Sequence, residues 1–371
     1  MGGGLLQLVA YGAQDVYLTG NPQITFFKVV YRRHTNFSME AIEQTFNGTA
    51  DFGKRVTCQI SRNGDLIHRM YLVATFNSSV AGADDWLAYS MIKSVELEIG
   101  GQRIDKQYGD WMFIWNELSL PYGKRTGFNT MVLKDSDGTK AASQTVYVPL
   151  EFWFCRNPGL ALPLIALQYH EVKVNLEFEA AATAAPGPGL SGGAISSASL
   201  WVDYIFLDTD ERRRFAQLSH EYLIEQLQFT GEEAVTASTT NRVKLNFNHP
   251  VKELVWVNQA TGAAFGVYTA TTDAKLQLNG HDRFATRNGA YFTKVQPYQH
   301  HTNIPETDGI NVYSFALRPE EHQPSGTLNM SRIDNATLVV TTGDATKLRV
   351  YAHSYNVLRV MSGMGGLAYS N

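Results

Sequence analysis

The sequence predicts an all-β protein in which two similar sandwiches or barrels follow each other along the chain. Three observations predict this fold: short runs that alternate between apolar and polar residues, turn residues at short spacing between them, and a similar hairpin segment in each half. The 371 residues allow two or three domains. Because 44% of them are hydrophobic and 12% aromatic, we expect folded domains with a large core.

The clearest strand of the first half is Ser94–Ile99. Val95, Leu97 and Ile99 alternate there with two glutamates, which is typical of a strand with one buried and one wetted face. The candidate strands of this half are Lys54–Ile60, Leu66–Phe76, Ser94–Ile99, Thr145–Phe154, Glu171–Phe178 and Leu200–Leu207.

The second half repeats this style. Its candidate strands are Leu223–Phe229, Arg242–Phe247, Val251–Val257, Lys275–Leu278, Ile310–Leu317, Thr337–Thr341 and Leu348–Val360. Helical patterns are few, and the best are Asp110–Leu118 and Asp210–Leu218. We expect Asp210 to cap the second helix, since a carboxylate can accept the unpaired backbone N–H groups of a first turn.

A pairing between the halves favours duplication of one module. Residues 97–104 (LEIGGQRI) resemble residues 276–284 (LQLNGHDRF), and both segments contain a turn dipeptide, Gly-Gly or Asn-Gly, that tolerates the positive φ of a tight hairpin. Each half then has a Pro/Gly segment, at 157–159 and at 323–326, and ends on a long strand. The common order of these features predicts two copies of one fold.

Residues 180–199 contain no charge and are rich in Gly, Pro and Ser, which predicts a loop. A linker between domains is the competing interpretation. We favour a loop between two strands because the strand at Leu200 is expected to pair with Glu171–Phe178. The boundary between the halves is then expected near Thr209–His220.

Four blocks that span the chain, residues 2–38, 276–284, 313–334 and 355–369, closely resemble the major capsid proteins of nucleocytoplasmic large DNA viruses. The resemblance implies an all-β fold of two tandem eight-stranded antiparallel jelly rolls, a double jelly roll with short helices in loops. It divides the chain into an N-terminal arm (1–23), a first jelly roll (24–209) and a second jelly roll (210–371).

The resemblance also implies a structural role and no enzymatic activity. It predicts a homotrimer that forms pseudo-hexameric capsomers, which tile an icosahedral shell assembled in the host cytoplasm. The implied partners are neighbouring capsomers and minor capsid or penton proteins, with the inner viral membrane as a further candidate. Since the net charge is only -4, direct nucleic-acid binding is not expected.

Two groups of residues are candidates for assembly contacts. Large apolar side chains in an arm that is poor in regular structure would be costly to leave in water, and basic clusters could meet acidic partners. The alternatives are a frayed terminus and a solvated face with local ion pairs to Asp208, Asp210 and Glu211. The candidates are Leu5, Leu8, Tyr11, Tyr17, Leu18, Arg32, Arg33, Arg212 and Arg213.

We expect no catalytic site, cofactor or metal. The adjacent His300 and His301 would point to opposite faces of a strand, and Cys58 and Cys155 form no metal-type pair. Two other classes stay open: a carbohydrate-binding double β-sandwich that serves in attachment, and a β-sandwich hydrolase. Exposed aromatic residues on one rim would favour the first, and a pocket with close carboxylates or a His-based pair would favour the second.

Overall fold

A computed structural model describes residues 12–14, 26–27, 34–76, 86–134, 144–181 and 194–369. The chain divides into two units, Met1–Phe37 and Ser38–Asn371. The described residues of the first unit include turns at 13–14 and 26–27. The four sheets lie in the second unit, apart from Phe37 at the start of one edge strand.

The first half of the second unit is a sandwich of two sheets. Sheet 1A has the strand order β1 (Phe37–Thr45), β9 (Ile195–Leu207), β3 (Leu66–Phe76), β6 (Thr145–Pro149), and β7 (Leu162–Pro163) also pairs with β3. Sheet 1B has the order β2 (Arg55–Gln59), β8 (Val172–Phe178), β4 (Ile92–Ile99), β5 (Gln102–Gln107).

The second half is built in the same way. Sheet 2A has the order β10 (His220–Val235), β19 (Thr346–Met361), β12 (Pro250–Ala260), β16 (Asn311–Ser314), with β17 (Leu328–Asn329) on β12 and β20 (Met364–Leu367) on β19. Sheet 2B has the order β11 (Asn241–Leu245), β18 (Ala336–Thr342), β13 (Thr271–Leu278), β14 (His281–Asp282), with β15 (Arg287–Asn288) on β13.

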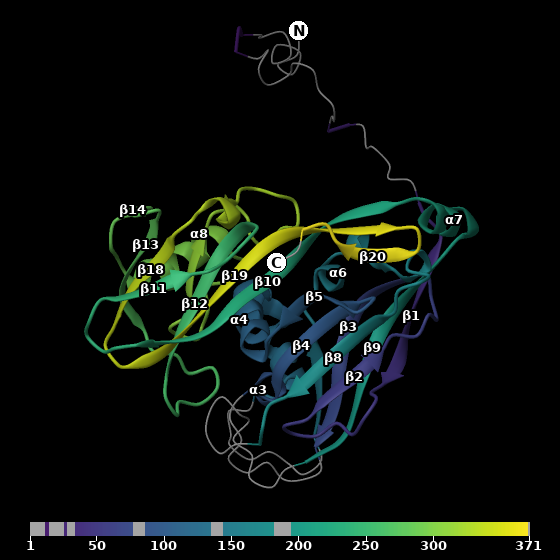
Figure 1. Ribbon diagram of the computed structural model, residues 1–371, viewed down its shortest axis with the longest axis horizontal. Helices are drawn as coiled ribbons and strands as arrows, with labels where there is room; N and C mark the ends of the chain where they lie inside the picture. Colours follow the sequence, from purple (N-terminus) through teal and green to yellow (C-terminus); the bar gives the residue numbers. More distant parts are fainter. Residues whose placement is uncertain are drawn as a thin grey trace, which may run out of the picture. The chain divides into compact units, whose positions relative to one another are not determined.

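The two halves share one topology. Without the short additions β7, β15, β17 and β20, each half has eight strands. One sheet of each half contains the first, eighth, third and sixth of these strands, in that order. The other sheet has the second, seventh, fourth and fifth. Neighbouring strands run antiparallel. This interleaved order defines a jelly roll. The predicted fold class, a double jelly roll, is therefore confirmed (Figure 1).

Helices are short and lie between strands, as expected. They are α3 (Leu87–Ser90), α4 (Gly109–Ser119), α5 (Arg125–Met131), α6 (Trp153–Arg156), α7 (Thr209–Gln217) and α8 (Gln296–His300), with single turns η1 (Tyr122–Lys124), η2 (Pro158–Leu160), η3 (Leu164–Ala166), η4 (Tyr291–Val295) and η5 (Met330–Arg332). Among the described residues, no helix is both long and apolar enough to cross a membrane.

The two predicted hairpins are present at equivalent places in the halves. Gly100 and Gly101 connect β4 to β5 with φ values of 58° and 85°, and Asn279 and Gly280 connect β13 to β14 with 50° and 84°. Positive φ at both central positions is what a tight two-residue hairpin demands, and Gly and Asn meet it at the lowest steric cost.

Three expectations are wrong in detail. The strand expected over Thr145–Phe154 ends at Pro149, and Trp153–Arg156 is helical. The strand expected at Leu200 pairs with β3 and not with Glu171–Phe178, because β8 lies in the opposite sheet between β2 and β4. Asp208 caps α7 in place of Asp210, since the helix begins at Thr209 and the Asp208 carboxylate accepts its backbone N–H.

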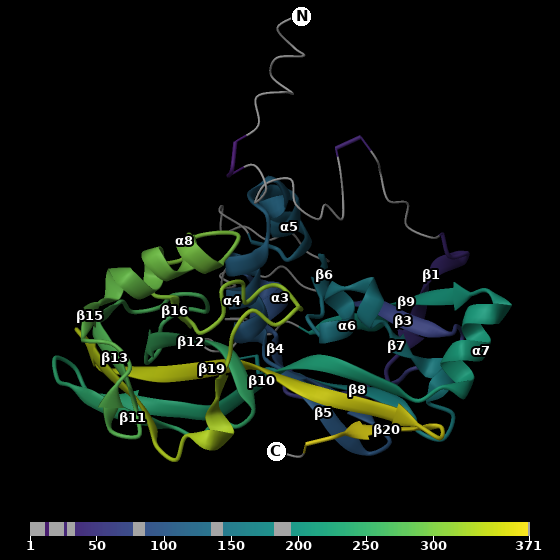
Figure 2. The same ribbon diagram turned by 90° about the horizontal axis from the view of Figure 1, so that it is seen from above.

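One ribbon of two strands extends over both halves. β10 and β19, each 16 residues long, pair along most of their length. Leu348 and Val350 of β19 lie in the core of the second half, whereas Leu358 and Val360 pack into the core of the first. Figure 2 shows this ribbon running from the second sandwich across the first, with β20 at its far end. The two sandwiches therefore share a structural element.

Candidate assembly interface

Helix α4 lies at the junction of the two jelly rolls. Its sequence, GDWMFIWNELS, is apolar on most of its surface, which predicts a helix buried on all sides. Residues Gly109 to Leu118 are all buried. A Cβ atom at Gly109 would fall 2.2 Å from the carbonyl oxygen of Tyr89, so only glycine allows this close approach.

Asp110, in the first turn of α4, ties the helix to the second jelly roll. Its carboxylate accepts hydrogen bonds from the hydroxyls of Tyr268 at 2.5 Å and Tyr351 at 2.8 Å, and it lies 3.3 Å from the Arg349 guanidinium. Burial alone would lower the pKa of Arg349, but the Asp110 charge raises it above its ordinary value. A buried charge pair with extra hydrogen bonds fixes the junction in one arrangement.

A second buried cluster centres on Glu225 of β10. Its carboxylate oxygens lie close to side-chain nitrogens of four basic residues: Arg156 of α6 at 2.7 Å, Lys252 of β12 at 2.8 Å, His353 of β19 at 3.1 Å and His322 at 3.4 Å. Burial would raise the pKa of Glu225, but hydrogen bonds from the two histidines outweigh burial and hold it well below its ordinary value. Because Arg156 belongs to the first half, this cluster also crosses the junction.

The cluster continues through Glu253 to the segment after α8. The Glu253 carboxylate lies 3.2 Å from His353 Nδ1 and 2.9 Å from His301 Nε2, and His301 Nδ1 lies 2.9 Å from Glu320. Burial alone would lower the pKa of His301, but the Glu253 charge and hydrogen bonds to Glu253 and Glu320 raise it to about 9. His300 ends α8 and His301 follows it, so the expectation that the two side chains point to opposite faces of a strand does not apply here.

Acids and imidazoles that alternate in this way could pass protons, but the central groups of this cluster are closed to solvent, and only end members such as Glu320 and His322 are partly exposed. The side chains of His301 and Glu253 are 0% exposed and that of His353 is 3% exposed. No substrate can reach groups so enclosed. Among the described residues, no group of three or more His, Cys, Asp or Glu could hold a metal ion. The arrangement holds segments together.

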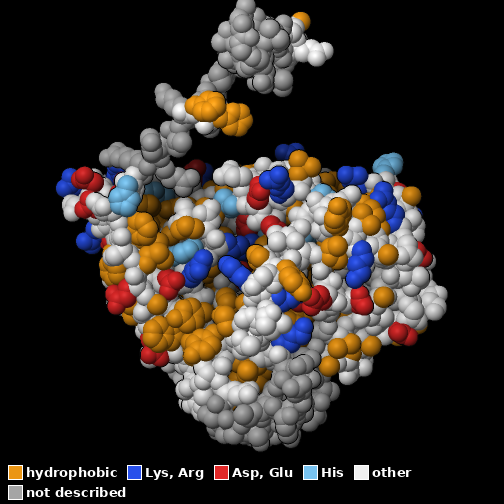
Figure 3. All heavy atoms as spheres, turned by 180° about the vertical axis from the view of Figure 1, so that it is seen from behind, with side chains coloured by type: hydrophobic (Ala, Val, Ile, Leu, Met, Phe, Trp, Pro, Cys, Tyr) orange, Lys and Arg blue, Asp and Glu red, His pale blue; other side chains and the backbone are white. Residues whose placement is uncertain are grey.

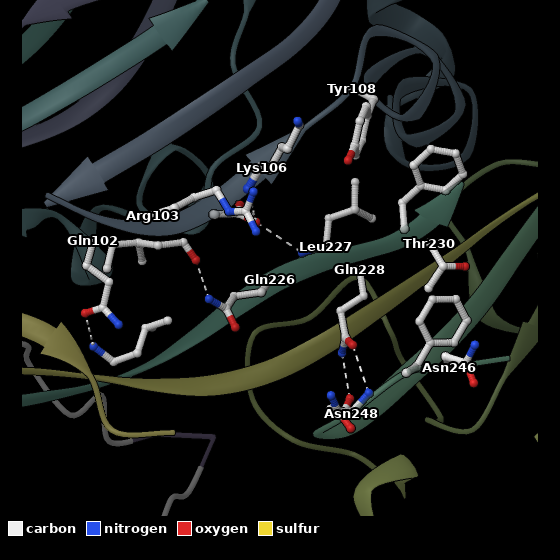
Figure 4. Close-up of a pocket in the computed structure, with 15 residues that line it drawn as sticks. Gln102, Arg103, Lys106, Tyr108, Gln226, Leu227, Gln228, Thr230, Asn246 and Asn248 are labelled. Carbon is white, nitrogen blue, oxygen red and sulfur yellow. Dashed lines mark hydrogen bonds between the residues drawn. The ribbon is translucent and has the colours of Figure 1, made fainter. Parts of the chain in front are cut away.

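A groove of 570 Å³ follows the seam between β5 and β10 (Figure 4). Many of its polar atoms are already bonded: Gln226 donates to the Ile104 carbonyl, and Gln228 both donates to and accepts from the backbone of Asn248. The Asp105 carboxylate accepts the backbone N–H of Leu227. The bonds of Ile104 and Asp105 join β5 to β10 along the seam, and those of Gln228 join β10 to the segment before β12.

The sequence-predicted contact residues fall into two sets. Leu5, Leu8, Tyr11, Tyr17, Leu18, Arg32 and Arg33 lie outside the described residues. Arg212 and Arg213 lie on the exposed helix α7.

The basic cluster of α7 is partly neutralised. Arg212 pairs with Asp65 at 2.9 Å and Arg214 with Glu211 at 3.4 Å, whereas Arg213 pairs with no described acid. The expected local pairing with Glu211 is present. The Asp208 carboxylate serves as the helix cap, and Asp210 forms no ion pair with a described residue.

Residues that join the halves are the ones that the sequence analysis missed. These residues come from four separate places in the chain and follow no motif: Asp110, Glu225, Lys252-Glu253 and His353. One signal was available, because Lys252 and Glu253 interrupt the otherwise apolar run Val251–Val257. Adjacent charges in a buried strand indicate an internal ion-pair cluster, since unpaired charges are rarely buried.

The tandem topology and the joined interior define a structural protein of the double-jelly-roll class. Comparison with family models matches residues 25–208 to "Major capsid protein N-terminus" and residues 211–366 to "Large eukaryotic DNA virus major capsid protein". The major capsid protein of Pyramimonas orientalis virus is 63% identical over 403 aligned positions that cover 100% of both chains. That of Paramecium bursaria Chlorella virus 1 is 48% identical, again over 100% of both.

Solved structures agree. A chain of the PBCV-1 virus capsid superimposes with a TM-score of 0.85 at 43% identity, covering 94% of this chain and 100% of that one. The Faustovirus major capsid protein has a TM-score of 0.75 at 13% identity, which shows the shared fold. The chain belongs to the family of large eukaryotic DNA virus major capsid proteins. It is a structural component of the virion capsid and, like its relatives, is not an enzyme.

Proposed function

We propose that this chain forms a homotrimer whose six jelly rolls make one pseudo-hexameric capsomer, and that such capsomers tile an icosahedral shell. The observation that carries the proposal is the identical strand order of the two halves. Three chains with two similar modules each offer six similar edges, and six edges suit near-hexagonal packing. Shell subunits must associate with one another, which the family membership already implies.

We also propose the division of the chain into an arm (1–23), a first jelly roll (24–209) and a second jelly roll (210–371). The two family matches, 25–208 and 211–366, support these limits. The helix α7 connects β9 to β10 at the proposed boundary.

The purified chain is expected to sediment as a trimer at micromolar concentration and to remain one on dilution. Interfaces in permanent oligomers are large and apolar, so dissociation should be negligible at such concentrations. Analytical ultracentrifugation over a dilution series measures the mass. A stable monomer at micromolar concentration would contradict the trimer.

The arm is proposed to dock under its own or a neighbouring capsomer through Leu5, Leu8, Tyr11, Tyr17 and Leu18. Deletion of residues 2–20 is expected to leave soluble trimers but to impair shell formation, because it removes apolar contacts between capsomers. Electron microscopy of particles assembled from the truncated and the full-length chain compares the two. Normal particles from the truncated chain would refute this role of the arm.

The same proposal includes contacts with minor capsid or penton proteins and with the inner viral membrane. It also includes assembly in the host cytoplasm. A groove of 700 Å³ near α7 supports a contact surface, because Tyr169, Leu218 and Met361 line it and are 75%, 61% and 55% exposed. Arg213, which pairs with no described acid, lies on the same helix α7. The similar proteins of other viruses are capsid proteins, which favours the shell over a carbohydrate-binding attachment protein.

A further inference from the structure

The outer face of sheet 2A is covered by the first half of the same chain. Along β12, Leu254 and Trp256 point into the second jelly roll, whereas Val255 and Val257 belong to the cluster that includes the first half. Tyr351 of β19, which pairs with Val255, packs against Trp111 of α4 with 5.5 Å between ring centroids. The helical segments of the first jelly roll therefore pack on the outer face of sheet 2A in the second.

The same face of sheet 1A is covered only in part among the described residues, where α5 and α6 pack against β6 and β3. Tyr71 of β3 and Trp201 of β9 are paired and stack with ring centroids 6.3 Å apart, and Tyr147 of β6 is 43% exposed. A groove of 670 Å³ opens here, lined by these tyrosines, Met131 and Asp203 among others. Asp203 forms no ion pair with a described residue. Figure 3 shows hydrophobic side chains exposed on the first-half side of the molecule.

The elements that cover sheet 2A have counterparts in the second half. Helix α4 follows β5, and α6 follows β6 just before the Asn157-Pro158-Gly159 segment. At the same places in the second jelly roll, η4 and α8 follow the hairpin of β14. A segment with Leu317 and Arg318 follows β16, before Gln323-Pro324-Ser325-Gly326.

These counterparts form one exposed surface. Tyr298 of α8 is 76% exposed, Leu317 is 73% exposed, and the Arg318 side chain is 72% exposed. His300 Nδ1 lies 3.0 Å from the Leu317 carbonyl oxygen, which joins the helix to the segment. The surface thus offers an aromatic residue, an aliphatic residue and a cation, which pairs within the chain with Glu321 at 2.9 Å. Its inner side packs on sheet 2A, where Gln296 accepts the backbone N–H of Ser314 and the Lys252 carbonyl oxygen accepts that of Phe315. Its outer side, which carries the three exposed side chains, is covered by no sheet of the described residues.

We infer that the outer face of sheet 1A in one copy binds the surface of Tyr298, Leu317 and Arg318 in a second copy. Each contact between copies resembles the contact between the two jelly rolls within one chain. The jelly rolls of successive chains are therefore arranged in a ring. Within the chain, Arg156 of α6 pairs with Glu225 on the covered sheet. Between copies, Arg318, which follows β16 as Arg156 follows β6, meets Asp203 of β9, whereas Glu225 lies on β10, so the ion pair is similar in kind but not in strand. The contact is head-to-tail, and three chains close it. This inference rests on the proposed homotrimer and names the surfaces that hold it.

Two single substitutions test the two sides of the contact. Leu317→Asp places a charge on the covering surface and Tyr147→Asp places one on the sheet face, so each should shift the sedimenting species from trimer to monomer. Val267→Asp is the matched control, since Val267 is 55% exposed but belongs to neither surface, and should remain a trimer. Circular dichroism verifies that each variant keeps its strands.

A mixing experiment tests the direction of the contact. Leu317→Asp retains an intact sheet face and Tyr147→Asp retains an intact covering surface. An equimolar mixture should therefore give one-to-one dimers that neither variant gives alone. The charge pair is tested by Asp203→Lys and Arg318→Asp, each of which should weaken the trimer, and by their combination, which should restore it.

The outcomes separate this inference from the proposed function. A trimeric native chain whose Leu317→Asp and Tyr147→Asp variants are also trimers would overturn the named surfaces and leave the trimer standing. A mixture that yields no dimers would overturn the head-to-tail contact. A monomeric native chain would overturn both the surfaces and the capsomer.

Discussion

Replacing Asp110 by alanine should lower the free energy of unfolding by about 3–5 kcal/mol, the cost of leaving one partner of a buried ion pair behind. Arg349 is 8% exposed, and the hydroxyls of Tyr268 and Tyr351 also lose their acceptor. Urea unfolding followed by tryptophan fluorescence measures the change, because Trp111 lies one residue away in α4 and reports on the junction.

Asp334→Ala is the matched control for this substitution. Asp334 is exposed and forms no ion pair with a described residue, so its loss should change the free energy of unfolding by no more than about 0.5 kcal/mol. If Asp110→Ala were no more harmful than Asp334→Ala, the buried pair would not hold the two jelly rolls together.

The second large effect is a loss of stability on the alkaline side of neutrality. The folded protein raises the pKa of His301 from 6.5 to about 9 through Glu253 and Glu320. Since the folded state holds this proton more tightly than the unfolded chain, its contribution is complete below pH 6.5. It declines as pH rises from 6.5 to about 9 and is absent above that. The shift corresponds to about 3 kcal/mol.

His301→Gln isolates this contribution. The difference in free energy of unfolding between the native chain and this variant should shrink by about 3 kcal/mol between pH 6 and pH 9.5. His281→Gln, on the exposed β14, should show no such dependence. An equal difference at both pH values for His301→Gln would mean that the proton on His301 does not stabilise the folded chain.

The strands that the sequence predicts best are those with one buried and one wetted face. Val95, Leu97 and Ile99 are each 0% exposed in β4, as their alternation with glutamates indicates. The hairpins were predictable because Gly100-Gly101 and Asn279-Gly280 demand a special backbone conformation. One-sided burial of a strand and positive φ in a hairpin each restrict the residue types at neighbouring positions, so both can be predicted from a short stretch of sequence.

Elements without such local constraints were missed. β1 is almost wholly exposed and has no apolar period, so it was missed, and the polar β5, QRIDKQ, was foreseen only as the second arm of its hairpin. The pairing of β9 with β3 depends on the whole interleaved topology, which no window of residues encodes. The junction was missed for the same reason, because Asp110 and Arg349 meet only after both modules have folded.

The ribbon of β10 and β19 has a mechanical consequence. Its strands contribute to the interior of both sandwiches, and their backbone pairing is interrupted at the bulge between Phe229 and Glu232 and continues on either side of it. A large change in the angle between the sandwiches would therefore disturb paired backbone groups on both sides. The ribbon therefore ties the two described sandwiches together along both of its strands. In the proposed shell, we expect the bending that closes a flat array into a container to be concentrated where separate polypeptides touch.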